Sequence, residues 1–271
     1  DTADVYGKRG GSETCLGKYL GARRKDIFLA SKFGGPMHAP EDKNGNMKGC
    51  SRRYIMQAVE ASLKRLNTDW IDLYQMHRFD QETPLDETMR ALDDLVKQGK
   101  VRYLGFSTLV GWPFVDMQWT ARQLGTTPLT CCESEYSILK RGAERDLIPA
   151  MLKHGAQLLP YYPLAGGFLT GKYKRSAPLP EGARITKGER YQGMFISEEN
   201  WDILDRLEAF CAARNRTLLE LAFGWLLAQP VIATVIAGAT KPEQLEANIR
   251  AIEWELTPAE VAEVNEISKK D

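Results

Sequence analysis

The sequence predicts an α/β fold with a parallel sheet, and three features of the chain agree on it. Short apolar runs rich in β-branched residues alternate with longer amphipathic stretches, which is typical of βαβ units. No break in composition marks a linker. The length of 271 residues suits one large α/β barrel or two modest domains, either of which can bury a substantial core.

The alternation assigns each element in turn. The predicted strands cover residues 27–32, 71–77, 101–107, 129–135, 157–162 and 231–238. The predicted helices cover residues 12–20, 52–66, 85–97, 113–122, 144–153 and 242–249. In the third helix, Leu85, Met89, Leu92 and Val96 recur at three- and four-residue steps and define a buried face. Residues 34–50 and 176–197, rich in glycine, proline and charge, are predicted to be irregular.

Charge and cysteine content narrow the function classes. The 36 basic and 36 acidic side chains cancel, so no global field attracts nucleic acid or an anionic membrane. The five cysteines are odd in number and follow no metal-ligand spacing, which predicts reduced thiols and a cytoplasmic protein. No apolar run has the length of a membrane span, and no leader is visible in the sequence given. We expect a small-molecule substrate.

Four reactive side chains stand at or just beyond predicted strand ends. Asp1 and Tyr6 belong to the opening heptad DTADVYG, Lys32 closes IFLASK, and His77 closes IDLYQMH. The carboxyl ends of parallel strands in a barrel meet on one face, so these residues are expected to be neighbours. Singly, each has a structural explanation, such as a cap, a packed ring or a solvated charge. His38 and His154 are interpreted as surface residues.

The four groups together predict a proton-transfer site. A phenol has a pKa near ~10, and a nearby ammonium such as Lys32 would favour the phenolate of Tyr6. Asp1 would balance the lysine charge, because an unpaired buried ammonium is costly. His77 could donate a hydrogen bond to a substrate carbonyl. Such general-acid catalysis contributes about 10² to 10⁴ in rate. With no obvious nucleophile in the protein, the attacking species should be a cofactor hydride.

Competing chemistries fit less well. Gly166, Gly171 and Lys172 have the spacing of a phosphate-binding P-loop, but Tyr173 follows where a Ser or Thr is required. No GxGxxG fingerprint follows a strand, which argues against a Rossmann dehydrogenase. Three scattered histidines argue against metal-dependent hydrolysis, and no metal site is predicted.

The chain resembles the aldo-keto reductase superfamily over essentially its whole length. DTADVYG, LASK and LYQMHRFD are followed in the family's order by LGFST, SEYSILKR, YYPLAGGFLTGKY and VIAGATKPEQLEANI. The similarity is greatest to bacterial reductases and potassium-channel β subunits. The resemblance implies a single (β/α)₈ TIM-barrel domain over residues 1–271 that reduces an aldehyde or ketone with NADPH. Tyr6 would be the general acid, Lys32 and Asp1 its tuners, and His77 the orienting donor. It also implies N-terminal truncation, with the first βα unit and most of the second strand absent, so that no strand precedes Asp1.

The resemblance also supplies cofactor-binding candidates. Against the nicotinamide these are Ser107, Thr108, Glu133 and the stacking ring of Tyr161. Thr108 and Glu133 replace the usual Asn and Gln, and Ala247 replaces a usual Glu. For the phosphates and adenosine they are Leu164, Gly166, Lys172, Arg184, Gly238, Thr240, Lys241, Gln244 and Asn248. Lys241, at a helix N-terminus, suits the extra phosphate of NADP and favours it over NAD.

A second function remains open at this point: a cofactor-binding sensor or scaffold with little or no turnover. The four reactive residues disfavour it, and the expected truncation favours it. The identity of the carbonyl compound and the oligomeric state are not predicted, because specificity depends on variable loops.

Overall fold

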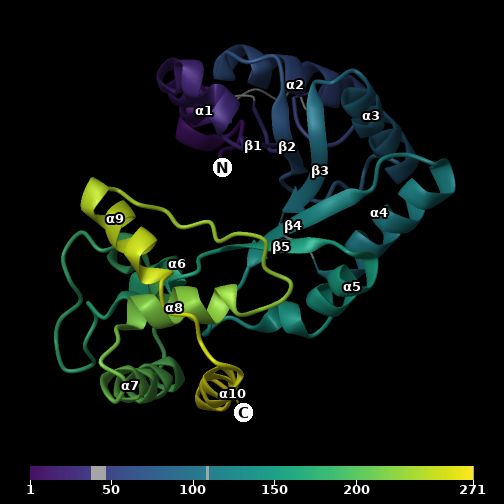
Figure 1. Cartoon of the computed structure of the whole chain (residues 1–271). Coiled ribbons are helices and arrows are strands. Elements are labelled where there is room, and N and C mark those ends of the chain that lie inside the picture. Colours follow the sequence, from purple (N-terminus) through teal and green to yellow (C-terminus); the bar gives the residue numbers. More distant parts are fainter. Residues whose placement is uncertain (38–46, 108–109, 271) are drawn as a thin grey trace. The chain divides into compact units, whose positions relative to one another are not determined.

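The computed structural model describes residues 1–37, 47–107 and 110–270 of the chain. It forms two compact units (Figure 1). The first unit comprises Asp1–Glu133 and Arg145–Gln157, and the second comprises Ser134–Glu144 and Leu158–Asp271.

The sheet consists of five strands that neighbour one another in chain order, from β1 to β5. Their bounds are β1 Ala30–Phe33, β2 Ile71–Met76, β3 Val101–Ser107, β4 Leu129–Glu135 and β5 Gln157–Tyr161. The first four pair in parallel, with Lys32 opposite Gln75, Gln75 opposite Gly105 and Ser107 opposite Glu133. Residues at these positions share one face of the sheet. This agrees with the predicted α/β class and its parallel strands.

The helices of the first unit pack side by side in chain order, each on the next (Figure 1). They are α1 Tyr6–Leu20, α2 Arg52–Leu66, α3 Leu85–Lys97, α4 Gly111–Leu124 and α5 Leu147–His154. A 3₁₀ helix, Gly21–Asp26, follows α1. On α3 the residues Met89, Leu92 and Leu95 are at most 1 % exposed, and each such side chain contributes roughly 1.5–3 kcal/mol. Val96, the fourth predicted residue of that face, is half-buried.

The start of α1 is irregular. Gly7, Lys8, Arg9 and Gly10 all have positive φ, so a left-handed turn precedes the right-handed helix. Glycine adopts this geometry without strain, whereas Lys8 and Arg9, at φ 63° and 64°, do not. The turn explains why the helical pattern in the sequence began only at Ser12.

The second unit contains five α-helices within its described residues. They are α6 Glu189–Phe195, α7 Glu198–Ala212, α8 Leu218–Leu227, α9 Pro242–Ala251 and α10 Pro258–Ile267. Three 3₁₀ helices accompany them: Gly142–Glu144, Ala165–Thr170 and Arg184–Lys187. Arg184–Lys187 and α6 lie in the segment that was predicted to be irregular. The motif around Gly171 folds partly as the 3₁₀ helix Ala165–Thr170 and not as the strand-to-helix loop of a P-loop.

The predicted strand at residues 231–238 is wrong. This segment runs beside β5, where Leu158 donates to Val231 and Ala233 donates to Leu158, but only one bridge forms. Pro160 has no N–H to continue the ladder. The next bond then shifts by one residue, because Ile236 rather than residue 235 donates to the Pro160 carbonyl.

The sheet of the first unit is strongly curved. Lys32 Nζ on β1 lies 3.0 Å from Glu133 Oε2 on β4, with β2 and β3 between them. In a flat sheet these strands would be about 14 Å apart, and side chains stand roughly perpendicular to the sheet. The contact therefore requires the sheet to curl toward this face, which gathers side chains from four strands.

Candidate active site

The segment that carries Asp1 is fixed to β1 by its backbone. The Thr2 amide donates to the Ala30 carbonyl and the Asp4 amide to the Lys32 carbonyl, both at 3.0 Å. These bonds have the two-residue spacing of a parallel strand, although the segment is not part of the sheet itself. The position of Asp1 is therefore set directly by the strand that carries Lys32, which the sequence did not reveal.

Lys32 is the fully buried centre of the site. Its Nζ lies 2.8 and 2.6 Å from the two carboxylate oxygens of Asp1, 3.0 Å from Glu133 Oε2 and 3.3 Å from the Thr2 carbonyl. Burying an ammonium is tolerable only with such partners. Two carboxylates, rather than the one expected, balance this lysine.

Gln75 completes the arrangement and was missed in the sequence. Its Nε2 donates to Glu133 Oε2 at 3.0 Å across β3, where Gly105 stands between them. A Cβ at Gly105 would lie 2.9 Å from the Cys131 sulfur and 3.0 Å from Gln75 Cγ. The glycine thus leaves the space that Gln75 needs. The sequence does contain a signal for Gln75, because this residue stands two positions before His77 and so shares its face of the strand.

Tyr6 and His77 lie next to each other, and Tyr6 also lies close to Lys32. Their ring centroids are 5.5 Å apart at an interplanar angle of 83°, and Lys32 Nζ is 5.2 Å from the Tyr6 ring centroid. Tyr6 is 40 % exposed while Lys32 is fully buried. The Tyr6 ring is therefore close to a buried ammonium and is itself partly open to solvent.

His77 is held in its neutral form. Burial lowers its pKa to about 4, with the positive charges of Lys32 and Arg78 adding to the effect. Its Nδ1 is buried and has no hydrogen-bond partner within the described chain. A neutral imidazole carries one N–H and one acceptor nitrogen. At physiological pH it can therefore donate a hydrogen bond to a ligand but is not a source of protons.

The remaining candidates of the first unit surround β3 and β4. Ser107 is buried at the end of β3, and Thr108 lies outside the described residues, as does His38. Glu133 was assigned to the cofactor amide, and its Oε2 is engaged by Lys32 and Gln75. His154 is half-buried against the Phe114 ring rather than free on the surface.

In the second unit, several candidates follow β5. Tyr161 ends this strand, and Leu164 precedes the 3₁₀ helix that begins with Ala165 and Gly166. Gly166 has φ 67°, and a Cβ there would lie 2.9 Å from the Phe195 ring. Lys172 is exposed and 5.1 Å from the Tyr173 ring centroid. Arg184 stacks on the Tyr162 ring at 4.9 Å.

The last candidates gather at the start of α9. Lys241 is the N-cap residue, and the Gln244 side chain accepts from both the amide and the hydroxyl of Thr240, at 2.8 and 3.1 Å. Gly238 is exposed, and Asn248 is half-buried further along the helix. Lys241 is exposed and makes no ion pair with the described residues.

The described residues contain neither a group of side chains arranged to bind a metal ion nor a helix able to span a membrane. No group of three or more His, Cys, Asp or Glu side chains among them is arranged to bind a metal ion. None of the helices in residues 1–37, 47–107 and 110–270 combines the length and apolarity needed to cross a membrane.

The chain is similar in sequence to several known proteins. An uncharacterized oxidoreductase, YrpG of Bacillus subtilis, is 35 % identical over 98 % of this chain and 81 % of its own length. The NADP(+)-designated aldo-keto reductase yakc of Schizosaccharomyces pombe is 36 % identical over 98 % of this chain and 77 % of its own. A putative voltage-gated potassium channel subunit beta of the same yeast is 32 % identical over 98 % and 79 %.

The model of the aldo/keto reductase family matches residues 1–269. A match over nearly the whole chain gives no support to the expectation that a first βα unit is missing. The match and the relatives together confirm the resemblance drawn from the motifs, including the similarity to bacterial oxidoreductases and potassium-channel β subunits. On this match and on relatives of more than 30 % identity along almost its full length, the chain belongs to the aldo/keto reductase family.

Proposed function

We propose that this protein reduces an aldehyde or ketone to an alcohol with NADPH, and that Tyr6 is the general acid. Membership in the family and relatives named as oxidoreductases indicate a carbonyl-reducing oxidoreductase. The observation that carries the finer proposal is the cluster in the first unit. There the buried ammonium of Lys32, paired with Asp1, lies 5.2 Å from the ring of Tyr6, which faces His77.

Each residue has a role that follows from its setting. The Tyr6 hydroxyl gives its proton to the substrate carbonyl oxygen while a hydride reaches the carbonyl carbon. Lys32 stabilises the phenolate left behind, and Asp1 and Glu133 hold the lysine in place. Neutral His77 donates a hydrogen bond that orients the carbonyl, which requires no change in its charge. A bound NADPH would supply the hydride.

The second unit offers groups suited to a phosphate-bearing cofactor. Gly166 is buried in a left-handed turn, and a side chain there would collide with Phe195, so this turn requires glycine. Lys172 and Lys241 are exposed and have no carboxylate partner among the described residues. We assign these three residues, with Arg184, to phosphate binding, and Lys241 to the additional phosphate that distinguishes NADPH from NADH. The curl of the sheet in the first unit supports a single (β/α)₈ barrel.

The test is the oxidation of NADPH, followed by absorbance, with a panel of aldehydes. Tyr6→Phe should reduce kcat by at least about 10²-fold, because it removes only the hydroxyl that donates the proton. Tyr19→Phe is the matched control, since Tyr19 is 62 % exposed on α1 and should retain full activity. Equal rates for the wild type and Tyr6→Phe would exclude Tyr6 as the acid. Lys241→Gln should raise KM for NADPH far more than for NADH.

The similarity to a protein named as a potassium channel subunit supports a second candidate function, that of a cofactor-binding sensor or scaffold. A sensor or scaffold would bind NADPH without turnover. Tight NADPH binding by the wild type with no oxidation across the whole aldehyde panel would favour that function over the reductase.

A further inference from the structure

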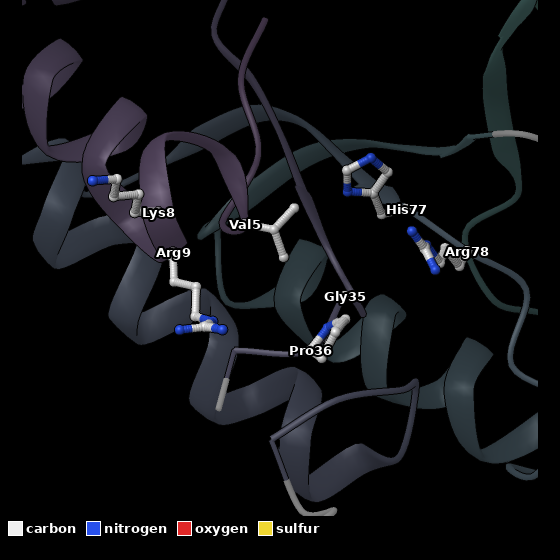
Figure 2. Close-up of a pocket in the computed structure, with 7 residues that line it drawn as sticks. All are labelled: Val5, Lys8, Arg9, Gly35, Pro36, His77 and Arg78. Atoms are coloured by element: carbon white, nitrogen blue, oxygen red, sulfur yellow. The ribbon is translucent and has the colours of Figure 1, made fainter. Parts of the chain in front are cut away.

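A cavity of about 460 Å³ lies beside His77 in the first unit (Figure 2). Val5 and Pro36 form apolar parts of its wall, and the other side chains that line it are basic: Lys8, Arg9, His77 and Arg78. In the view of Figure 2, His77 and Arg78 lie on one side of Val5 and Arg9 lies on the other, while the Lys8 ammonium points away from His77.

The three charged residues of this cavity have no anionic partner. Within residues 1–37, 47–107 and 110–270, Lys8, Arg9 and Arg78 form no ion pair or hydrogen bond with a carboxylate. Asp80, two residues from Arg78, is occupied by the Cys50 amide and the Thr83 hydroxyl, both at 2.7 Å. The cavity therefore carries an uncompensated positive charge next to the side chain that would orient a substrate.

The backbone that carries Lys8 and Arg9 provides a second observation. Both residues hold left-handed φ angles of 63° and 64° between Gly7 and Gly10. Residues other than glycine rarely adopt such angles, and strain of this kind persists where the surrounding structure enforces it, often at binding sites. The left-handed turn replaces the first turn of a regular helix after Tyr6, the proposed acid. It places Lys8 and Arg9 in the lining of the cavity.

We propose that this cavity binds the anionic group of the substrate, so that the protein prefers carbonyl compounds bearing a carboxylate or phosphate. The inference rests on the proposed function, because it places the reacting carbonyl between Tyr6 and His77 and the anion in the adjoining cavity. Arg9 and Arg78 make charge-assisted hydrogen bonds to that anion, and Lys8 adds to the field at the rim. Arginine is well suited to this contact because its planar fork matches carboxylate and phosphate oxygens.

The test compares 4-carboxybenzaldehyde with 4-formylbenzamide, which has nearly the same shape but no charge. The wild type should show a kcat/KM at least about tenfold higher for the acid, mainly through KM, as expected for one charge-assisted contact. Arg9→Gln with Arg78→Gln should abolish this preference and leave the amide within about twofold. Arg53→Gln, an exposed arginine on α2 outside the cavity, is the control for loss of charge alone.

A phosphate-bearing aldehyde, glyceraldehyde 3-phosphate against glyceraldehyde, distinguishes the two anions. An equal kcat/KM for the charged and uncharged compounds in both pairs would overturn the proposal, as would a double variant that lowers the rates of both equally. Calorimetric binding of 4-carboxybenzaldehyde and the amide provides a readout that does not require turnover. Selective binding of the acid without turnover would overturn the proposed function and retain the cavity assignment, whereas equal binding would overturn the cavity assignment itself.

Discussion

Asp4 carries a buried charge whose removal should change the pH dependence of stability. Its side chain is 1 % exposed, and neither carboxylate oxygen has a close hydrogen-bond partner within the described chain. Burial, reinforced by the nearby carboxylate of Glu13, raises its pKa to about 7. The Val5 amide, Arg65 and the Tyr54 hydroxyl offset only part of this effect. Because Glu13 is itself bound by Arg65 and Ser31, at 2.7 and 2.5 Å, it cannot move away.

The sign and size follow from linkage. In the unfolded chain the Asp4 pKa is near 3.8, so between about pH 4 and pH 7 the folded protein binds more protons at this site than the unfolded protein. The free energy of unfolding therefore falls as pH rises through this window. Between about pH 5.5 and about pH 8.5, Asp4 alone should lower it by about 2 kcal/mol. Asp4→Asn has no titrating carboxyl at this position. Its free energy of unfolding, relative to that of the wild type, should therefore increase by about 2 kcal/mol from about pH 5.5 to about pH 8.5.

Urea unfolding at the two pH values measures this difference. Coincident transitions by circular dichroism and tryptophan fluorescence are required first, because the free energies assume a single transition. Asp80→Asn is the control. Burial raises the pKa of Asp80, but hydrogen bonds from Thr83, Cys50 and Glu82 more than offset this and hold it below its usual value. Its contribution is lost only in acid, and its relative stability should be constant between the two pH values. A change below about 0.5 kcal/mol for Asp4→Asn would refute the reasoning.

Three further predictions address the site, the helix packing and the thiols. By NMR, His77, assigned with His77→Gln, should titrate with a pKa near 4, and an ordinary value near 6.5 would contradict its buried setting. Gly17→Ala should lower the free energy of unfolding by about 1–3 kcal/mol, because the new Cβ would lie 2.3 Å from the Arg65 carbonyl oxygen. Gly11→Ala, which enters open space, should lose nothing, and equal stability of the two variants would refute the steric argument. Brief alkylation near ~pH 8 should modify exposed Cys15 first, since burial raises the pKa of Cys50 to about 12; mass spectrometry showing comparable labelling of Cys50 would contradict this.

The first half of the fold was predictable because its signals are local. Residues 52–66 and 85–97 were predicted with the observed bounds of α2 and α3, where apolar periodicity and turn residues agree. β3 and β4 were equally clear. The strand at residues 231–238 failed because its pairing depends on a partner, and Pro160 of that partner cannot donate.

The helices missed in the second unit have two different explanations. α7 follows an N-cap serine, Ser197, and α10 opens with a capping box between Thr257 and Glu260, so both were recognisable. α8 also begins with a capping box, between Thr217 and Glu220, but the rest of its sequence is almost continuously apolar and lacks the amphipathic period of a surface helix. That run indicates burial without indicating the type of element.

In the candidate site, the residue types were predictable and their partners were not. Asp1, Tyr6, Lys32 and His77 could be selected because each stands near a strand end. The pairing of Lys32 with Glu133 depends on sheet curvature, which no local pattern encodes. The basic cavity was missed because Lys8, Arg9 and Arg78 look like ordinary solvated charges, and no sequence pattern shows that the left-handed turn places Lys8 and Arg9 at the same cavity as Arg78.

Gly105 has a bearing on how mutagenesis of this site should be interpreted. It has no polar side-chain atom and takes no part in proton transfer, yet an alanine there would press on Gln75, which donates to Glu133, the second carboxylate beside Lys32. One methyl group on β3 could thereby displace the Glu133 carboxylate on β4 from the Lys32 ammonium on β1. A loss of activity in Gly105→Ala would reflect a steric clash and not the removal of a reactive group. A screen that ranks positions by activity alone would therefore list Gly105 among the catalytic residues.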